Sequence, residues 1–194
     1  MGRAQRNPTR KSQTMQDRRV QTEGGTYFFT IVTDARRPFL CEPENISLLR
    51  TVYNEIKSKH PFTIDAIVIL PDHMHCLWTL PTGDFDYSMR WRQIKSAFSR
   101  QCKHQYKGEA TRSRIKKKEQ PVWQRRFWEH AIQNDLDFQN HVEYIHYNPV
   151  KHGLTSAPSD WKYSSFQRYV DRGIYPQDCG AGTSMKFSDT TGHE

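Results

Sequence analysis

Two histidines one residue apart, His73 and His75, are the first candidates for chemistry, and they lie in segment 70–78, LPDHMHCLW. The segment follows an apolar stretch and a tight turn, so we expect a strand from His73. Side chains alternate across a strand, so both imidazoles share one face and together can bind one divalent ion. About 0.4 such pairs are expected by chance, so the spacing alone also fits two solvated histidines at a sheet edge.

Tyr144 and Asn148 are the second pair of candidates, and they lie in a segment with helical periodicity. Residues four apart lie one turn from each other on one helix face. A tyrosine can act as a covalent nucleophile when a partner or a metal activates the reaction, and the carbonyl oxygen of Asn148 suits Mg²⁺ or Mn²⁺. The structural alternative is that Tyr144 packs in the core and that Asn148-Pro149 forms a turn.

Basic residues alternate with aromatic ones in two segments, 90–92 (RWR) and 125–128 (RRFW). Guanidinium groups can pair with phosphates while aromatic rings stack on unpaired bases. The alternative is that Trp91 and Trp128 are core residues flanked by solvated arginines. The nucleic-acid reading predicts DNA contacts by Arg18, Arg19, Arg90, Arg92, Lys95, Arg125, Arg126 and Trp128.

The overall charge favours a polyanionic partner. Among 194 residues, 29 Lys and Arg exceed 21 Asp and Glu, which gives a net charge of +8 and a pI of about 9.4. Nucleic acid is the usual partner for such an excess, although a generally basic surface is the alternative. The four cysteines are far apart and form no C-x-x-C, which argues against a zinc ribbon, a thioredoxin-like site and a disulfide scaffold.

The distribution of charge and apolar residues predicts one folded domain over residues 23–179. Residues 1–22 contain six Lys or Arg, one acid and almost no apolar residues, so we expect a disordered basic arm. Residues 107–120 are almost wholly polar and predict a basic loop, and residues 180–194 predict a flexible tail. No apolar run approaches the length of a membrane span, so we expect a soluble, cytoplasmic protein without a membrane partner, and a DNA partner would make it nucleoid-associated.

Hydrophobic periodicity predicts a strand, a helix, two strands, a helix, a strand and a final helix. The strands are expected at Thr26–Thr33, Thr63–Leu70, His73–Leu80 and Arg126–Ile132, and the helices at Glu44–Lys59, Ser88–Tyr106 and Leu136–Val150. This order is the split βαβ, ferredoxin-like plan, an α+β fold whose antiparallel sheet carries helices on one face. The fold by itself does not define the chemistry.

These motifs, in this order, resemble the HUH-type single-tyrosine transposases and, within them, the REP-associated tyrosine transposases. The matching segments are 24–30, 70–81, 90–95, 123–131 and 144–153. The resemblance implies an HUH endonuclease fold in which His73 and His75 bind a divalent metal ion and Tyr144 is the nucleophile. Asn148 stands where many single-tyrosine transposases carry a metal-binding glutamine. The arm before Arg18 and the loop 107–120 look like additions, so the resemblance assigns them no role.

The resemblance further implies a DNA nuclease and strand transferase that forms a 5′-phosphotyrosine intermediate on hairpin-forming, REP-like single strands. We expect Mg²⁺ or Mn²⁺ as the cofactor and a monomer, with a homodimer as the open alternative. Two other function classes stay open. One is a metal-dependent phosphoesterase with a water nucleophile, and the other is a non-catalytic ferredoxin-like module that binds single-stranded nucleic acid.

Overall fold

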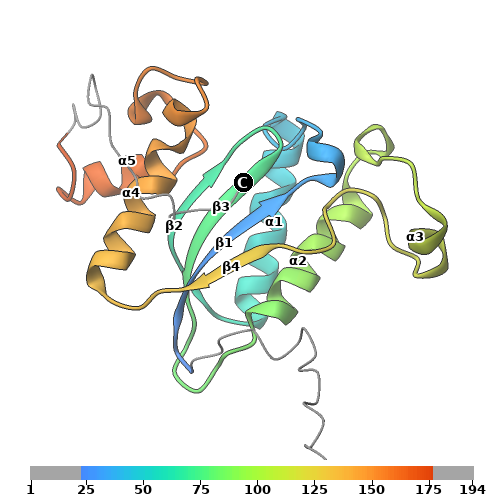
Figure 1. The fold of residues 1–194 in the computed structure, drawn as a ribbon, viewed down its shortest axis with the longest axis horizontal. Coiled ribbons are helices and arrows are strands. Elements are labelled where there is room, and N and C mark those ends of the chain that lie inside the picture. The colour runs from blue at the N-terminus through green and yellow to red at the C-terminus, as the bar shows by residue number, and fades with distance from the viewer. Residues whose placement is uncertain (1–22, 177–194) are drawn as a thin grey trace, which may run out of the picture.

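The computed structural model describes residues 23–176 and shows a four-stranded sheet with helices on both sides (Figure 1). The predicted basic arm 1–22, with Arg18 and Arg19, lies outside the described residues. So does the predicted tail 180–194. Among residues 23–176, no helix combines the length and the apolar character that crossing a membrane requires.

The sheet consists of β1 (Thr26–Val32), β2 (Thr63–Ile69), β3 (His73–Thr79) and β4 (Trp128–Ala131). The strands are rich in β-branched and aromatic residues, which favour the pleated conformation. Their order is β2-β3-β1-β4, and every neighbouring pair is antiparallel. Because β3 lies between β1 and β2, the strands form the predicted split βαβ arrangement.

Helices α1 (Pro43–Lys59) and α2 (Tyr87–Gln101) pack together on one face of the sheet. Pro43 opens α1 at a position where its missing N–H costs nothing, and the Asp86 side chain caps α2 by accepting a hydrogen bond from Met89 N. The core between these helices and the sheet is aromatic. It includes Tyr27, Phe29, Trp78, Tyr87, Trp91 and Phe98.

Helix α4 (Asp135–Lys151) covers the opposite face of the sheet, which corrects the expectation that the helices lie on one face. The reason is that the strands carry apolar side chains on both faces. Phe28 points away from its neighbours Tyr27 and Phe29 and packs in a second core cluster with Val142 and Ile145 of α4. The sheet therefore needs a helical layer on each side.

The remaining differences from the expected elements are local. The second predicted helix ends at Gln101, before a 3-10 turn over His104–Tyr106. The predicted basic loop 107–120 contains a short helix, α3 (Arg112–Lys116), and a further helix, α5 (Phe166–Asp171), follows α4. Both helices are shorter than the periodicity of a sequence pattern can reveal.

Candidate active site

Strand β3 places His73 and His75 on the face of the sheet that α4 covers. Both side chains are buried, and their ring centroids lie 5.0 Å apart. On neighbouring β1, Val32 pairs with His73 and Thr30 pairs with His75. The alternation along the strand thus brings the two imidazoles together, as the sequence predicts, and excludes the solvated-edge alternative.

Each imidazole is oriented through its Nδ1 atom. Nδ1 of His75 shares a 3.0 Å hydrogen bond with Thr30 Oγ1, and Nδ1 of His73 is 2.6 Å from Asp72 Oδ1. Both Nε2 atoms are buried, and within residues 23–176 the Nε2 atom of His73 has no hydrogen-bond partner. A histidine that binds a metal through one nitrogen commonly donates a hydrogen bond through the other. This arrangement fits a metal-binding pair.

Asp72 is held in its charged form. Burial raises the pKa of its carboxyl group, but hydrogen bonds and charge from His73 and Arg36 outweigh burial and lower that pKa to about 2. The Nη1 atom of Arg36 is 2.9 Å from Asp72 Oδ2. The second carboxylate oxygen is therefore engaged as well, which fixes the carboxylate that orients His73.

Helix α4 brings Tyr144 and Asn148 to this face. Tyr144 and Asn148 are buried, and the Tyr144 ring centroid is 5.2 Å from that of His75. One turn beyond Asn148, the ring centroid of His152 is 5.2 Å from that of His73. Because residues four and eight apart follow one helix face, Asn148 lies between two residues that contact the histidine pair. The buried Oδ1 of Asn148 thus belongs to the same side-chain group.

Lys151 is a member of this site that sequence reasoning missed. Its Nζ atom donates a 3.3 Å hydrogen bond to the Tyr144 hydroxyl oxygen and lies 4.9 Å from the ring centroid. The ammonium places a positive charge beside the oxygen that would act as the nucleophile. A spacing of seven residues corresponds to two helical turns, which is the signal that could have pointed to Lys151.

A second polar group, His130, Asp137 and His141, lies near the first. Its ligand atoms are within 4.8 Å of one another, so the group could hold a metal ion. The Nε2 atom of His130 is 2.8 Å from Asp137 Oδ2, and Nδ1 of His141 is 3.0 Å from Asp137 Oδ1. The Phe28 ring contacts both this cluster and the histidine pair of β3. Its centroid is 4.8 Å from the ring centroid of His141 and 5.4 Å from that of His75.

Burial and hydrogen bonds act in different balance on the two titratable groups of this cluster whose pKa values shift, His141 and Asp137. Burial lowers the pKa of His141, although the backbone and carboxylate of Asp137 act in the opposite direction. Burial also raises the pKa of Asp137, but hydrogen bonds from His130 and the Gln133 backbone prevail and lower it. The sequence did not reveal this group because His130 comes from β4, and only the sheet brings it to the helix.

Arg90 was predicted to contact DNA, and the structure corrects this prediction. Its side chain is buried and forms an ion pair with Asp84 at 2.6 Å. The guanidinium also donates to the backbone oxygens of His60, Pro61 and Asp86. Its donors are therefore used within the fold, and the alternative reading of Trp91 as a core residue is correct.

Lys95 is half-buried and forms an internal hydrogen bond, and its predicted contact with DNA stays a prediction. Its Nζ atom donates to the backbone oxygen of Gln124 at 2.5 Å, which ties α2 to the segment before β4. Burial, followed by the positive charge of Arg114, lowers the pKa of Lys95 to about 8. The Trp128 ring is half-buried against Phe28. Of the predicted DNA-binding residues between 23 and 176, three are exposed, namely Arg92, Arg125 and Arg126.

Comparison with known proteins places this chain among the transposases. The family described as "Transposase IS200 like" matches residues 21–148, a range that includes both histidines, Tyr144 and Asn148. The match covers more than half of the chain. The chain belongs to the IS200-like transposase family.

Within that family, the chain is similar to REP-associated tyrosine transposases. It is 46% identical to the REP-associated tyrosine transposase of Escherichia coli (strain K12) over 171 residues, which cover 88% of this chain and 93% of the relative. A putative REP-associated tyrosine transposase of Haemophilus influenzae is 44% identical over 88% of this chain and 96% of its own length. A solved REP-associated tyrosine transposase bound to a REP hairpin matches with a TM-score of 0.73 and 41% identity, over 91% of this chain and 96% of the other. The resemblance seen in the motifs is confirmed.

Proposed function

We propose that this protein is a metal-dependent single-stranded DNA endonuclease and strand transferase that cuts at hairpin-forming repeats and uses Tyr144 as its nucleophile. The observation that carries the proposal is the packing of Tyr144 against His75, with Asn148 one turn further along the same helix face. Hairpin DNA as the substrate is supported by the similar transposase that was solved with a REP hairpin.

The two imidazoles and one amide oxygen form a donor set that fits a divalent ion such as Mg²⁺ or Mn²⁺. We assign Nε2 of His73, Nε2 of His75 and Oδ1 of Asn148 as its ligands, all three of which are buried. A metal ion bound there would act as a Lewis acid and withdraw charge from the scissile phosphate. Asp72 and Thr30 hold the imidazoles in the orientation that this binding requires.

Tyr144 performs the covalent step in this proposal. Its hydroxyl group gives up its proton and the oxygen attacks phosphorus, the bond between phosphorus and the 3′ oxygen breaks, and the 3′ oxygen takes up a proton. The products are a 5′-phosphotyrosyl protein and a DNA strand that ends in a 3′-hydroxyl. Lys151, whose ammonium donates to the Tyr144 oxygen, stabilises the negative charge that develops there. Attack by a 3′-hydroxyl reverses the reaction and rejoins DNA without an external energy source.

A denaturing gel with labelled hairpin-bearing single-stranded DNA and Mn²⁺ tests this proposal. We expect the wild-type protein to form a covalent protein–DNA band and Tyr144→Phe to form none, while both bind the DNA. Tyr147→Phe is the control, because Tyr147 lies on the same helix without the four-residue relation to Asn148. Cleavage without a covalent band would support the water-nucleophile phosphoesterase, and binding without cleavage would support the non-catalytic module. Either result would contradict the proposal.

A further inference from the structure

The family resemblance assigns no role to segment 107–120, which is distinct from the N-terminal residues 1–22. This segment projects from the domain but is fixed to it (Figure 1), and we call residues 107–120, and these only, the arm. Its two ends meet where the Gly108 backbone N–H donates to Pro121 O at 2.9 Å. Arg37 donates to the same Pro121 oxygen at 2.7 Å. Inside the arm, the Thr111 side chain caps α3 by accepting a hydrogen bond from Arg114 N. The arm is therefore a defined structural element.

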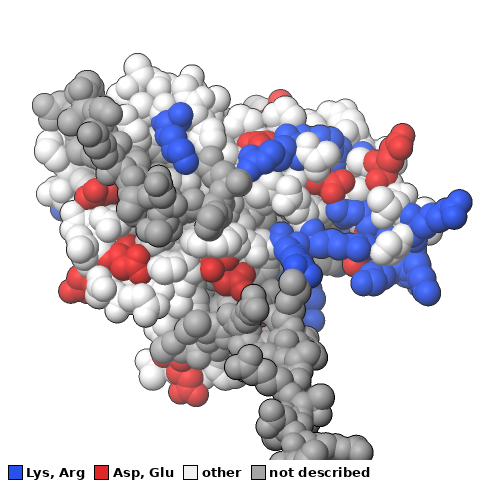
Figure 2. Space-filling model, in the orientation of Figure 1, with Lys and Arg blue, Asp and Glu red and all other residues white. Residues whose placement is uncertain are grey.

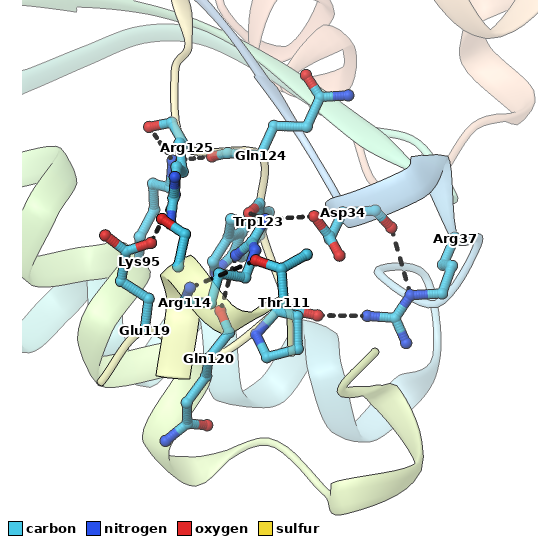
Figure 3. A network of polar contacts seen from close by, with 12 residues as sticks. Asp34, Arg37, Lys95, Thr111, Arg114, Glu119, Gln120, Trp123, Gln124 and Arg125 are labelled. Carbon is cyan, nitrogen blue, oxygen red and sulfur yellow. Dashed lines mark hydrogen bonds and ion pairs between the residues drawn. The ribbon is translucent and has the colours of Figure 1, made fainter. Parts of the chain in front are cut away.

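A buried arginine anchors the arm, as the close-up in Figure 3 shows. Arg114 forms an ion pair with Asp34 and donates to the backbone oxygens of Gln120 and Trp123 at 3.3 and 3.2 Å. Removing one partner of a buried, hydrogen-bonded pair is costly, because the other charge then stays buried without compensation. The anchor thus holds the exposed side chains of the arm at a fixed place relative to α2.

A groove of about 690 Å³ lies between this arm and α2. Arg92 and Arg100 from α2 line it, and so do Lys118 and Arg125 from the arm and the segment that follows it. All four side chains are exposed. The single acidic residue among the lining residues is Glu119, and it is already paired with Arg125 at 2.7 Å. Figure 2 shows Lys and Arg side chains gathered on this side of the molecule.

The aromatic residues of the groove do not offer a surface for stacking bases. Trp123 is buried. The Phe127 ring packs against the rings of Phe29 and Trp91, with ring centroids 6.0 and 6.1 Å apart. Proteins that hold unpaired strands combine positive charge with aromatic rings on which bases stack. Contacts to a sugar-phosphate backbone need only the cationic side chains. The groove therefore fits a nucleic acid whose bases are already paired.

We propose that the groove between α2 and the arm binds the phosphate backbone of the duplex stem of the hairpin. This inference rests on the proposed function for the identity of the DNA, but it concerns a surface separate from Tyr144 and the histidine pair. The arm adds cations to the side of the domain formed by α2, so it increases affinity for the stem without taking part in the covalent step.

The test compares two double variants that each remove two positive charges. Arg100→Gln/Lys118→Asn changes the groove, and asparagine suits position 118 because the backbone there has a φ of 54°. Arg50→Gln/Lys57→Gln is the matched control, since both residues are exposed on α1. The affinity for a labelled hairpin with a single-stranded flank is measured between 50 and 200 mM salt (roughly the range over which phosphate contacts dominate). The flank alone is measured in the same way.

We expect the groove variant to bind the hairpin about tenfold more weakly than wild type and to lose about 2 from the salt slope, while its binding to the flank alone is unchanged. The control should change hairpin affinity less than about twofold. Equal losses in both variants, an unchanged groove variant, or an equal loss on the flank alone would overturn the inference. Covalent adduct formation at saturating DNA separates the two proposals. Groove-dependent hairpin binding without any adduct would contradict the proposed function and leave the groove assignment standing.

Discussion

The two faces of the sheet are built from the same strands but differ in chemistry. Toward α1 and α2, β3 presents Trp78, whose ring stacks on Trp91 with centroids 4.2 Å apart. Toward α4, the same strand presents His73 and His75. Alternate residues of one strand thus supply an aromatic core and a polar site. The comparison teaches that the first face can fix the strand so that the second can hold imidazoles in place.

The polar face needs support that the aromatic face does not. A buried polar group costs free energy unless it is hydrogen-bonded, and the imidazoles obtain these bonds from Thr30 and Asp72. The aromatic face relies mainly on burial of apolar surface and on ring packing, and its hydrogen bonds include those of the Tyr53 hydroxyl with the sulfur atoms of Met74 and Cys76. Substitutions on the aromatic face should therefore affect stability, and substitutions of the imidazoles on the polar face should affect DNA cleavage.

The largest expected effect is on the aromatic face. Trp78→Ala removes a fully buried indole that packs against Phe62 and Trp91. We expect the free energy of unfolding to fall by about 3–5 kcal/mol, which denaturant titration would measure. A variant as stable as wild type would show that this face does not carry the fold.

The matching substitution on the polar face is His73→Ala. We expect the rate of covalent adduct formation to fall about 1000-fold, which corresponds to about 4 kcal/mol, because the site would lose one of the proposed metal ligands. Met74→Leu is the control, since Met74 is the next residue of the strand and points to the aromatic face. If His73→Ala cleaved DNA as fast as Met74→Leu, the polar face of the sheet would not be the one that carries the chemistry.

A smaller effect is expected from the residue that orients His73. Asp72→Asn keeps the shape of the side chain but removes the charge that accepts from the imidazole. We expect the affinity for Mn²⁺ to fall about 10–100-fold and cleavage to recover at high Mn²⁺ concentration. A metal titration of the cleavage rate measures both. Identical titration curves for the variant and wild type would show that Asp72 does not position His73.

The effect that is smallest near neutral pH concerns stability on the α4 side. Burial, followed by the charge of Arg168, lowers the pKa of His146 to about 3, and its Nε2 atom is 2.8 Å from Ser165 Oγ. Between about pH 6.5 and 3, the unfolded chain therefore binds a proton that the folded protein does not, so stability falls as the pH falls. We expect His146 to contribute up to about 1.4 kcal/mol per pH unit in this window. Denaturation at several pH values should show a weaker pH dependence for His146→Gln than for His104→Gln, which alters an exposed histidine. Equal dependence would refute this role.

The sequence was sufficient for those parts of the site that depend on local periodicity. Alternation along a strand placed His73 and His75 on one face, and helical spacing paired Tyr144 with Asn148. The order of elements was also sufficient for the sheet topology, because few arrangements satisfy it. The position of α4 was missed, although strands that are apolar on both faces indicate a covering layer on each side of the sheet.

Partners that come from distant segments could not be predicted. Arg90 is basic and flanks an aromatic residue, as a DNA-binding arginine would. Its guanidinium group is buried, however, and it pairs with Asp84 and donates to the backbone oxygens of His60 and Pro61. The internal hydrogen bond of Lys95 was also not predictable, because its acceptor on Gln124 comes from beyond residues 107–120. Charge patterns reveal which residues are basic, whereas only the tertiary fold determines which of them reach solvent.

The account depends most directly on the identity of the residue that becomes linked to DNA. The measurement is mass spectrometry of peptides from the covalent adduct after the DNA has been trimmed by nuclease. We expect the nucleotide remnant on Tyr144, which contacts His75 and accepts a hydrogen bond from Lys151. A remnant on Tyr147 or on any other residue would contradict the assignment of Tyr144 as the nucleophile.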